Sequence, residues 1–137
     1  MGYNLRQFLS FSFIGAIGFV VDAGFLQLLV SFGELNPYIG RVFSYLIAAS
    51  LTWELNRRYT FPKRADVKFH RQWFFYLGVN GIGGLLNYGT YALLVFNSRF
   101  FHHYLYLGVG VGAIISLACN FTLSKYFVFK YAPASRI

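Results

Sequence analysis

Residues 6–30 read RQFLSFSFIGAIGFVVDAGFLQLLV, and residues 71–95 read RQWFFYLGVNGIGGLLNYGTYALLV. The two stretches align without a gap, and an arginine followed by a glutamine opens both. Asp22 of the first stretch aligns with Asn87 of the second. Since a membrane-spanning helix needs about 20 mostly apolar residues, each stretch is long enough to cross a bilayer. The alignment therefore predicts one helical element that occurs twice in the chain.

A second pair of stretches repeats in the same order. TWELNRRYTF (52–61) aligns with NFTLSKYFVF (120–129), which places Arg57 over Lys125. The sequence thus predicts two repeats, at about 6–61 and 71–129. Each is an in–out–in helical hairpin with an even number of spans, so the repeats run parallel, about an axis along the membrane normal.

The composition is typical of a membrane protein. Hydrophobic residues make up 57% of the 137 residues and charged residues 12%, whereas a small soluble domain must leave much of its surface in water. The net charge of +8 does not indicate nucleic acid binding, because a basic patch needs a soluble face. The only cysteine, Cys119, excludes an internal disulfide bond.

Four segments have the length and composition of spanning helices: Phe8–Phe32, Tyr38–Leu55, Trp73–Phe96 and Tyr104–Leu123. Their connectors, at 33–37, 62–71 and 97–103, are too short to hold another domain. We therefore expect an all-α membrane protein, a single four-helix transmembrane domain over 1–137.

The distribution of the cationic residues predicts the orientation. If both termini and the central connector share one side, that side holds ten cations: Arg6, Arg57, Arg58, Lys63, Arg64, Lys68, Arg71, Lys125, Lys130 and Arg136. The other side holds only Arg41 and Arg99. The positive-inside rule then places both termini in the cytoplasm.

Small residues recur at every fourth position of the second and fourth segments. The two stripes are Ser44, Ala48, Thr52 and Asn56, and Gly108, Gly112, Ser116 and Asn120. Such stripes allow helices to pack closely. Because four helices form thin walls around a polar passage, a homodimer is also plausible, and Gly108 with Gly112 is one candidate contact.

Polar residues inside the predicted spans are candidate functional residues. An ionised Asp22 would cost on the order of 3 kcal/mol in the bilayer, so it should face the bundle or water. It either serves transport or pairs with Asn87 across the repeat axis. Asn80 and Asn87 share a face of the third segment and extend this polar surface.

The charged cluster that ends the second segment has two interpretations. Glu54 reaches Arg57 and Arg58 at helical spacings of three and four, which favours local ion pairs. The cations either snorkel to lipid headgroups or form an anion-binding site with Lys125 and the neighbouring amides of Asn56 and Asn120. Arginine suits a phosphate because its planar guanidinium donates in a fork.

The stretches RQFLSFSFIGAIGFVVD, TWELNRRYTF and NFTLSKYFVF resemble the GtrA-like family of small four-helix membrane proteins, over about residues 5–130. The resemblance implies movement of a polyprenyl-phosphate-linked sugar from the cytoplasmic to the outer leaflet of the bacterial cytoplasmic membrane, for surface polysaccharide glycosylation. Family motif positions fall on Asp22, Asn56, Arg57, Asn120 and Lys125. The chain departs from the family at Ser124-Lys125-Tyr126, where a second basic residue often follows, and at Glu54, where many relatives are apolar.

The leading hypothesis is therefore a flippase for a lipid-linked sugar, not an enzyme. Arg57, with Arg58 and Lys125, would bind the lipid phosphate. The sugar would follow a polar path formed by Asp22, Glu54, Asn56, Asn80, Asn87 and Asn120. Arg41 would receive the phosphate on the outer side, unless it only snorkels to the interface.

We expect no cofactor and no metal, since the three histidines have no neighbouring carboxylate or cysteine ligand. No ATP-binding motif is present, so transport would be downhill or proton-coupled through Asp22. Two other functions remain open. One is a small multidrug-type transporter, and the other is an assembly partner of a polyprenyl-phosphate glycosyltransferase.

Overall fold

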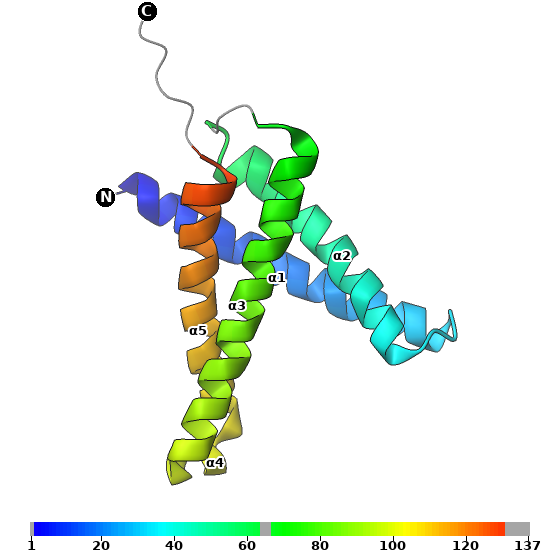
Figure 1. The fold of residues 1–137 in the computed structure, drawn as a ribbon, viewed down its shortest axis with the longest axis vertical. Helices are drawn as coiled ribbons and strands as arrows, with labels where there is room; N and C mark the ends of the chain where they lie inside the picture. Colours follow the sequence, from blue (N-terminus) through cyan, green and yellow to red (C-terminus); the bar gives the residue numbers. More distant parts are fainter. Residues whose placement is uncertain (1, 64–66, 131–137) are drawn as a thin grey trace, which may run out of the picture. The chain divides into compact units, whose positions relative to one another are not determined.

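The computed structural model describes residues 2–63 and 67–130, and the regular structure in these residues is helical (Figure 1). The elements are α1 Gly2–Ser31, α2 Pro37–Leu55, η1 Asn56–Thr60, α3 Phe69–Asn97, α4 Arg99–His103, α5 Leu105–Leu123 and η2 Ser124–Val128. These residues divide into two compact units, within Met1–Val67 and Lys68–Lys130. Each unit contains one of the repeats expected from the sequence. Arg64 and Arg136, two of the ten cations counted above, lie outside the described residues.

The first hairpin consists of α1 and α2, which lie side by side (Figure 1). Pro37 occupies the first turn of α2, where its missing N–H costs no hydrogen bond. The side chain of Asn36 caps this helix by accepting a 2.9 Å hydrogen bond from the backbone N–H of Tyr38. Glu34 takes a positive φ of 51° in the turn between the helices. A short, capped turn therefore returns the chain along α1.

The second hairpin consists of α3 and α5, with the short helix α4 between them (Figure 1). The connector expected at 97–103 therefore contains a helical turn. Helix α1 begins at Gly2 instead of Phe8, and α3 begins at Phe69 instead of Trp73. A helix can continue through polar residues outside the bilayer. A prediction from the apolar residues alone therefore gives a helix that is too short.

The same contacts recur in both hairpins. Near the start of α1, the Gln7 side chain donates a 3.2 Å hydrogen bond to the backbone carbonyl of Thr60. At the start of α3, Gln72 donates to the carbonyl of Val128 at 3.5 Å. These four residues align pairwise in the sequence repeat. The glutamine shared by the two repeats thus joins the beginning of each hairpin to its end.

An aromatic pair adjoins this glutamine in each hairpin. Phe11 meets Phe61 edge to face with ring centres 6.2 Å apart, and Tyr76 meets Phe129 at 5.9 Å. All four rings are buried. Edge-to-face pairs add to the stabilisation from burial, so they help hold the two ends of each hairpin together.

A glycine marks the close approach of the helices in each hairpin. A Cβ added at Gly18 would lie 2.4 Å from the Thr52 methyl carbon, and one at Gly83 would lie 2.0 Å from Asn120 Oδ1. Gly18 and Gly83 are again equivalent positions of the repeat, as are Thr52 and Asn120. The repeat is thus a repeat of packing as well as of sequence.

Large apolar side chains cover much of the outer surface. Phe19 is 74% exposed, Leu85 75% and Phe96 90%. A water-soluble protein of this size would not leave so many large apolar groups in water, whereas lipid accepts them. Among the described residues, Gly2–Ser31 and Leu107–Val128 are long and apolar enough to cross a membrane. The spanning of the membrane by α2 and α3 stays a prediction.

Candidate functional site

In each hairpin, most of the cations lie at one end, which we call its basic end. The basic end of the first hairpin is defined by Arg6, Arg57, Arg58 and Lys63, and that of the second by Lys68, Arg71, Lys125 and Lys130. At each basic end the last helix widens into a π-helical turn, η1 or η2.

The π-helical turns close with hydrogen bonds that span five residues. The N–H of Phe61 donates to the carbonyl of Asn56 at 2.8 Å, and the N–H of Phe129 donates to Ser124 at 2.8 Å. A π-turn holds one residue more than an α-turn and is found mostly as a single turn, frequently at functional sites. Sequence reasoning missed both turns, because an extra residue within a turn leaves no mark in hydropathy.

Each π-turn holds a cation over an aromatic ring one helical turn earlier. The guanidinium carbon of Arg57 lies 5.7 Å from the centre of the Trp53 ring. The ammonium of Lys125 lies 5.7 Å from the Phe121 ring and from the Tyr126 ring. Arg57 and Lys125 thus occupy the same place in their hairpins. Their meeting at one site joins residues of different units and stays a prediction.

Glu54 holds both arginines of the first hairpin, as the sequence predicted. Its carboxylate accepts from Arg57 Nη1 at 3.3 Å and from Arg58 Nε. The Arg57 side chain is 28% exposed and that of Arg58 is 67% exposed. In the second hairpin the position of Glu54 is taken by Thr122. The arginine cluster with its counter-ion therefore belongs to the first hairpin alone.

The amides near these cations differ in their hydrogen bonding. Asn56 is buried and its Oδ1 accepts from the Thr60 hydroxyl at 2.9 Å. The repeat aligns Asn56 with Ser124, whereas Asn120 lies one helical turn before Ser124. Within the described residues, Asn120 Oδ1 is buried without a hydrogen-bond partner. The two asparagines are therefore not equivalent.

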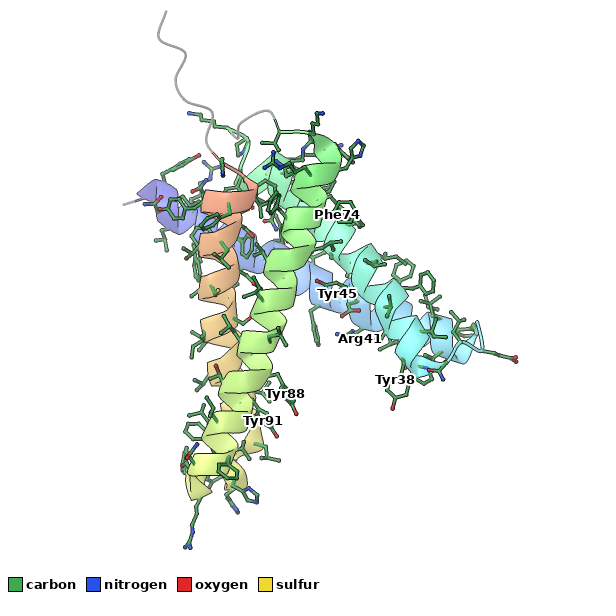
Figure 2. All side chains as sticks on the ribbon, in the orientation of Figure 1. Tyr38, Arg41, Tyr45, Phe74, Tyr88 and Tyr91 are labelled. Carbon is green, nitrogen blue, oxygen red and sulfur yellow. The ribbon has the colours of Figure 1, made fainter. Side chains whose placement is uncertain are left out.

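An ion pair lies between the two helices of the first hairpin. Arg41 Nη1 donates to Asp22 Oδ2, and the hydroxyl of Ser44 donates to Asp22 Oδ1 at 2.7 Å. The Asp22 side chain is 15% exposed and that of Arg41 is 55% exposed. Arg41 projects from the same side of α2 as Tyr38 and Tyr45 (Figure 2). This cluster was not expected from the sequence.

A signal for the ion pair exists in the register of the hairpin. In an antiparallel pair of helices, residues at similar distances from the connector lie opposite each other. Asp22 and Ser44 are equally far from Gly33 along the chain, and Arg41 lies one turn from Ser44. The sequence therefore contained enough information to pair Asp22 with α2.

The second hairpin has no counterpart of this ion pair. The positions equivalent to Asp22, Arg41 and Ser44 hold Asn87, Val109 and Gly112. A Cβ added at Gly112 would lie 2.5 Å from Asn87 Oδ1 and 2.6 Å from the backbone carbonyl of Asn87. Asn87 therefore packs directly against the glycine.

The other polar candidate in α3 bonds to its own helix. Asn80 donates from Nδ2 to the carbonyl of Tyr76 at 2.9 Å. Such back-bonding satisfies the amide donor locally and leaves Asn80 half-buried. Two neighbouring tyrosines, Tyr88 and Tyr91, project from one side of α3 (Figure 2).

The glycine stripe of α5 is used within the hairpin. Gly108 and Gly112 are both buried. The nearest atoms to a Cβ at Gly108 belong to Tyr91 and Val95, and those at Gly112 belong to Asn87. The stripe therefore packs against α3, and it does not offer a surface for a second copy of the chain.

Two repeated helical hairpins with apolar outer surfaces and basic ends define a helical membrane protein. The family model described as "GtrA/DPMS, transmembrane domain" matches residues 10–132, so the chain belongs to this family. A comparison with curated proteins found no match. The resemblance inferred from the sequence is confirmed, and family membership suggests a membrane function related to glycosyl lipids.

Proposed function

We propose that this protein is a flippase that moves a polyprenyl-phosphate-linked sugar from the cytoplasmic to the outer leaflet. The observation that carries the proposal is the repetition, in both hairpins, of a π-helical turn with a cation over an aromatic ring at the basic end. Two matched cations suit a ligand with a charged phosphate. The family supports a glycosyl lipid as that ligand.

The proposal requires four membrane spans with both termini in the cytoplasm. The excess of cations at the basic ends supports this orientation under the positive-inside rule. The basic ends then lie at the cytoplasmic surface, where the substrate is made. The protein would reside in the bacterial cytoplasmic membrane.

Arg57 and Arg58, with Lys125, form the phosphate-binding site in this proposal. Glu54 holds the two guanidinium groups in place until a phosphate competes for their donors. Charge-assisted bonds from arginine to phosphate are frequently bidentate, which favours an anionic headgroup over a neutral one. The asparagines at 56, 80, 87 and 120 supply the polar path for the sugar.

The ion pair of Asp22 with Arg41 regulates the outer part of the path. Arg41 can bind the arriving phosphate only after it separates from Asp22, and protonation of Asp22 would promote that separation. This provides a route to proton coupling. The same pairing disfavours a multidrug-type carrier, because a carboxylate neutralised by arginine is a poor site for a cationic substrate.

A reconstituted vesicle assay tests the proposal. Wild-type protein should move a labelled polyprenyl-phosphate hexose between leaflets, and Arg57→Gln should slow this at least about tenfold, since charged hydrogen bonds contribute about 1.5–3 kcal/mol. Arg99→Gln is the matched control, because Arg99 is an exposed cation at the opposite end of a hairpin. Its rate should equal that of the wild type.

Other outcomes would reassign the function. Equal rates for Arg57→Gln and the wild type would exclude the proposed phosphate site. Efflux of cationic dyes that Asp22→Asn abolishes would establish the multidrug-type carrier instead. Co-purification of a polyprenyl-phosphate glycosyltransferase, with no movement of lipid by the isolated protein, would establish the assembly partner.

A further inference from the structure

A pocket of about 300 Å³ lies at the basic end of the first hairpin, between the first turns of α1 and the turn η1. Its lining combines one cation with hydroxyl and amide side chains: Tyr3, Arg6, Gln7, Ser10, Tyr59 and Thr60. Small-molecule sites have volumes of roughly 300–1,000 Å³, so the pocket suits a headgroup and not an entire lipid. Among residues 2–63 and 67–130, no acidic residue lines it.

The charge of Arg6 is available to a ligand. Arg6 is exposed, and within residues 2–63 and 67–130 no carboxylate pairs with it. Arg57 and Arg58, by contrast, already share Glu54. An anion entering the pocket would therefore meet a guanidinium without displacing a counter-ion among the described residues.

The hydroxyl groups of the pocket present an acceptor. Thr60 Oγ1 donates its proton to Asn56 Oδ1 at 2.9 Å. Ser10 Oγ lies 2.9 Å from Thr60 Oγ1, so Ser10 must be the donor of that bond. The remaining lone pairs of Ser10 can then accept from a ligand. A guanidinium near a hydroxyl acceptor suits a phosphate whose substituent carries a hydroxyl group.

The second hairpin provides an internal reference for this pocket. Gln72 makes the same contact to the last turn as its counterpart in the first hairpin. Yet the positions of Ser10 and Thr60 are occupied by Phe75 and Val128. The hairpin scaffold therefore does not require hydroxyl groups at these positions. The Thr60 hydroxyl satisfies the buried amide of Asn56, which the second hairpin replaces by Ser124. The Ser10 hydroxyl also lines the pocket, where it is available to a ligand.

The surface beside the pocket suits acyl chains. Phe13 lies two helical turns after Arg6 on the same face of α1, and its side chain is 69% exposed. A phosphate bound at Arg6 would thus place attached chains along an apolar, exposed helix face. In the second hairpin the equivalent cation is Arg71. Its guanidinium carbon lies over the Phe75 ring, 5.5 Å from the ring centre.

We propose that this pocket binds the headgroup of an anionic phospholipid whose phosphate carries a hydroxylated substituent, as in phosphatidylglycerol. The site is separate from the transport site at Arg57, and the described residues of the second hairpin lack its two hydroxyl groups, since Phe75 and Val128 take the positions of Ser10 and Thr60. A soluble phosphodiester or glycerol phosphate shares the headgroup chemistry. The exposed apolar face of α1 favours the lipid.

Native mass spectrometry of the full chain in detergent tests the pocket, with phosphatidylglycerol as the probe. Arg6→Gln should weaken binding about tenfold, because it removes a charge-assisted bond. Arg71→Gln removes the equivalent cation of the second hairpin and should leave this affinity unchanged. Circular dichroism establishes that both variants are folded, and both substitutions are at exposed positions.

Ser10→Ala tests the hydroxyl acceptor separately. Binding of phosphatidylglycerol should weaken about fivefold, whereas binding of phosphatidic acid, which lacks the glycerol headgroup, should not change. Competition by glycerol phosphate at concentrations equal to the lipid would support the phosphate site and assign it to a soluble ligand.

Three results would overturn the proposal: equal binding by Arg6→Gln and the wild type, equal losses for Arg6→Gln and Arg71→Gln, or equally tight binding of phosphatidylcholine. None of these results bears on Arg57, so the pocket and the flippase proposal fail or succeed independently.

Discussion

Single glycines determine how closely the helices of each hairpin approach. Gly112→Ala would place a Cβ 2.6 Å from the backbone carbonyl of Asn87, which cannot move aside as a side-chain end can. We expect the free energy of unfolding to fall by about 1–3 kcal/mol, the usual cost of overpacking. Gly110→Ala in the same helix meets nothing within 4 Å and is the matched control. Unfolding in mixed micelles with increasing SDS measures both, and equal stabilities would contradict the close contact.

The carboxylate of Glu54 competes with any anion for Arg57 and Arg58. Glu54→Gln should therefore strengthen binding of a polyprenyl phosphate, while the free energy of unfolding changes by less than about 1 kcal/mol, as for other partly exposed ion pairs. Glu34→Gln, at an exposed turn position, is the control and should change neither quantity. Weaker binding by Glu54→Gln would mean that Glu54 orients the arginines more than it competes for them.

At the scale of the helices, the pair formed by Asp22 and Arg41 joins α1 to α2. A double-mutant cycle with Asp22→Asn and Arg41→Gln should give a coupling energy of about 1 kcal/mol or more in the free energy of unfolding. The cycle with Asn87→Ala and Val109→Ala tests the equivalent positions of the second hairpin, where no coupling is expected. Additive losses in the first cycle would show that the ion pair does not stabilise the hairpin.

The helices and their pairing were largely predictable from the sequence. Apolar length identifies the long helices, and the gapless alignment of 6–30 with 71–95 predicts that the two hairpins share their contacts. Hydropathy does not describe which side chains face each other, so it does not predict the ion pair of Asp22 with Arg41. Hydropathy also cannot detect a π-turn, because the extra residue at η1 or η2 changes the backbone conformation and not the composition.

For the whole molecule, the prediction concerns which helices cross the membrane and in which direction. By length and composition, α1 and the segment Leu107–Val128 are candidate spans. Helices α2 and α3 must also cross if each hairpin enters and leaves on one side. The basic ends then lie in the cytoplasm, and the turns near Glu34 and Arg99 lie outside.

Cysteine labelling on intact cells tests this topology. With Cys119→Ser as the background, Glu34→Cys and Arg99→Cys should react with a membrane-impermeant maleimide. Lys63→Cys and Lys130→Cys should react only after the membrane is permeabilised. All four positions are exposed, so protection would reflect the membrane and not burial. Labelling of Lys130→Cys but not Arg99→Cys in intact cells would place the second hairpin in the opposite direction. The two cations over aromatic rings would then lie on different sides of the bilayer, where they could not bind one phosphate.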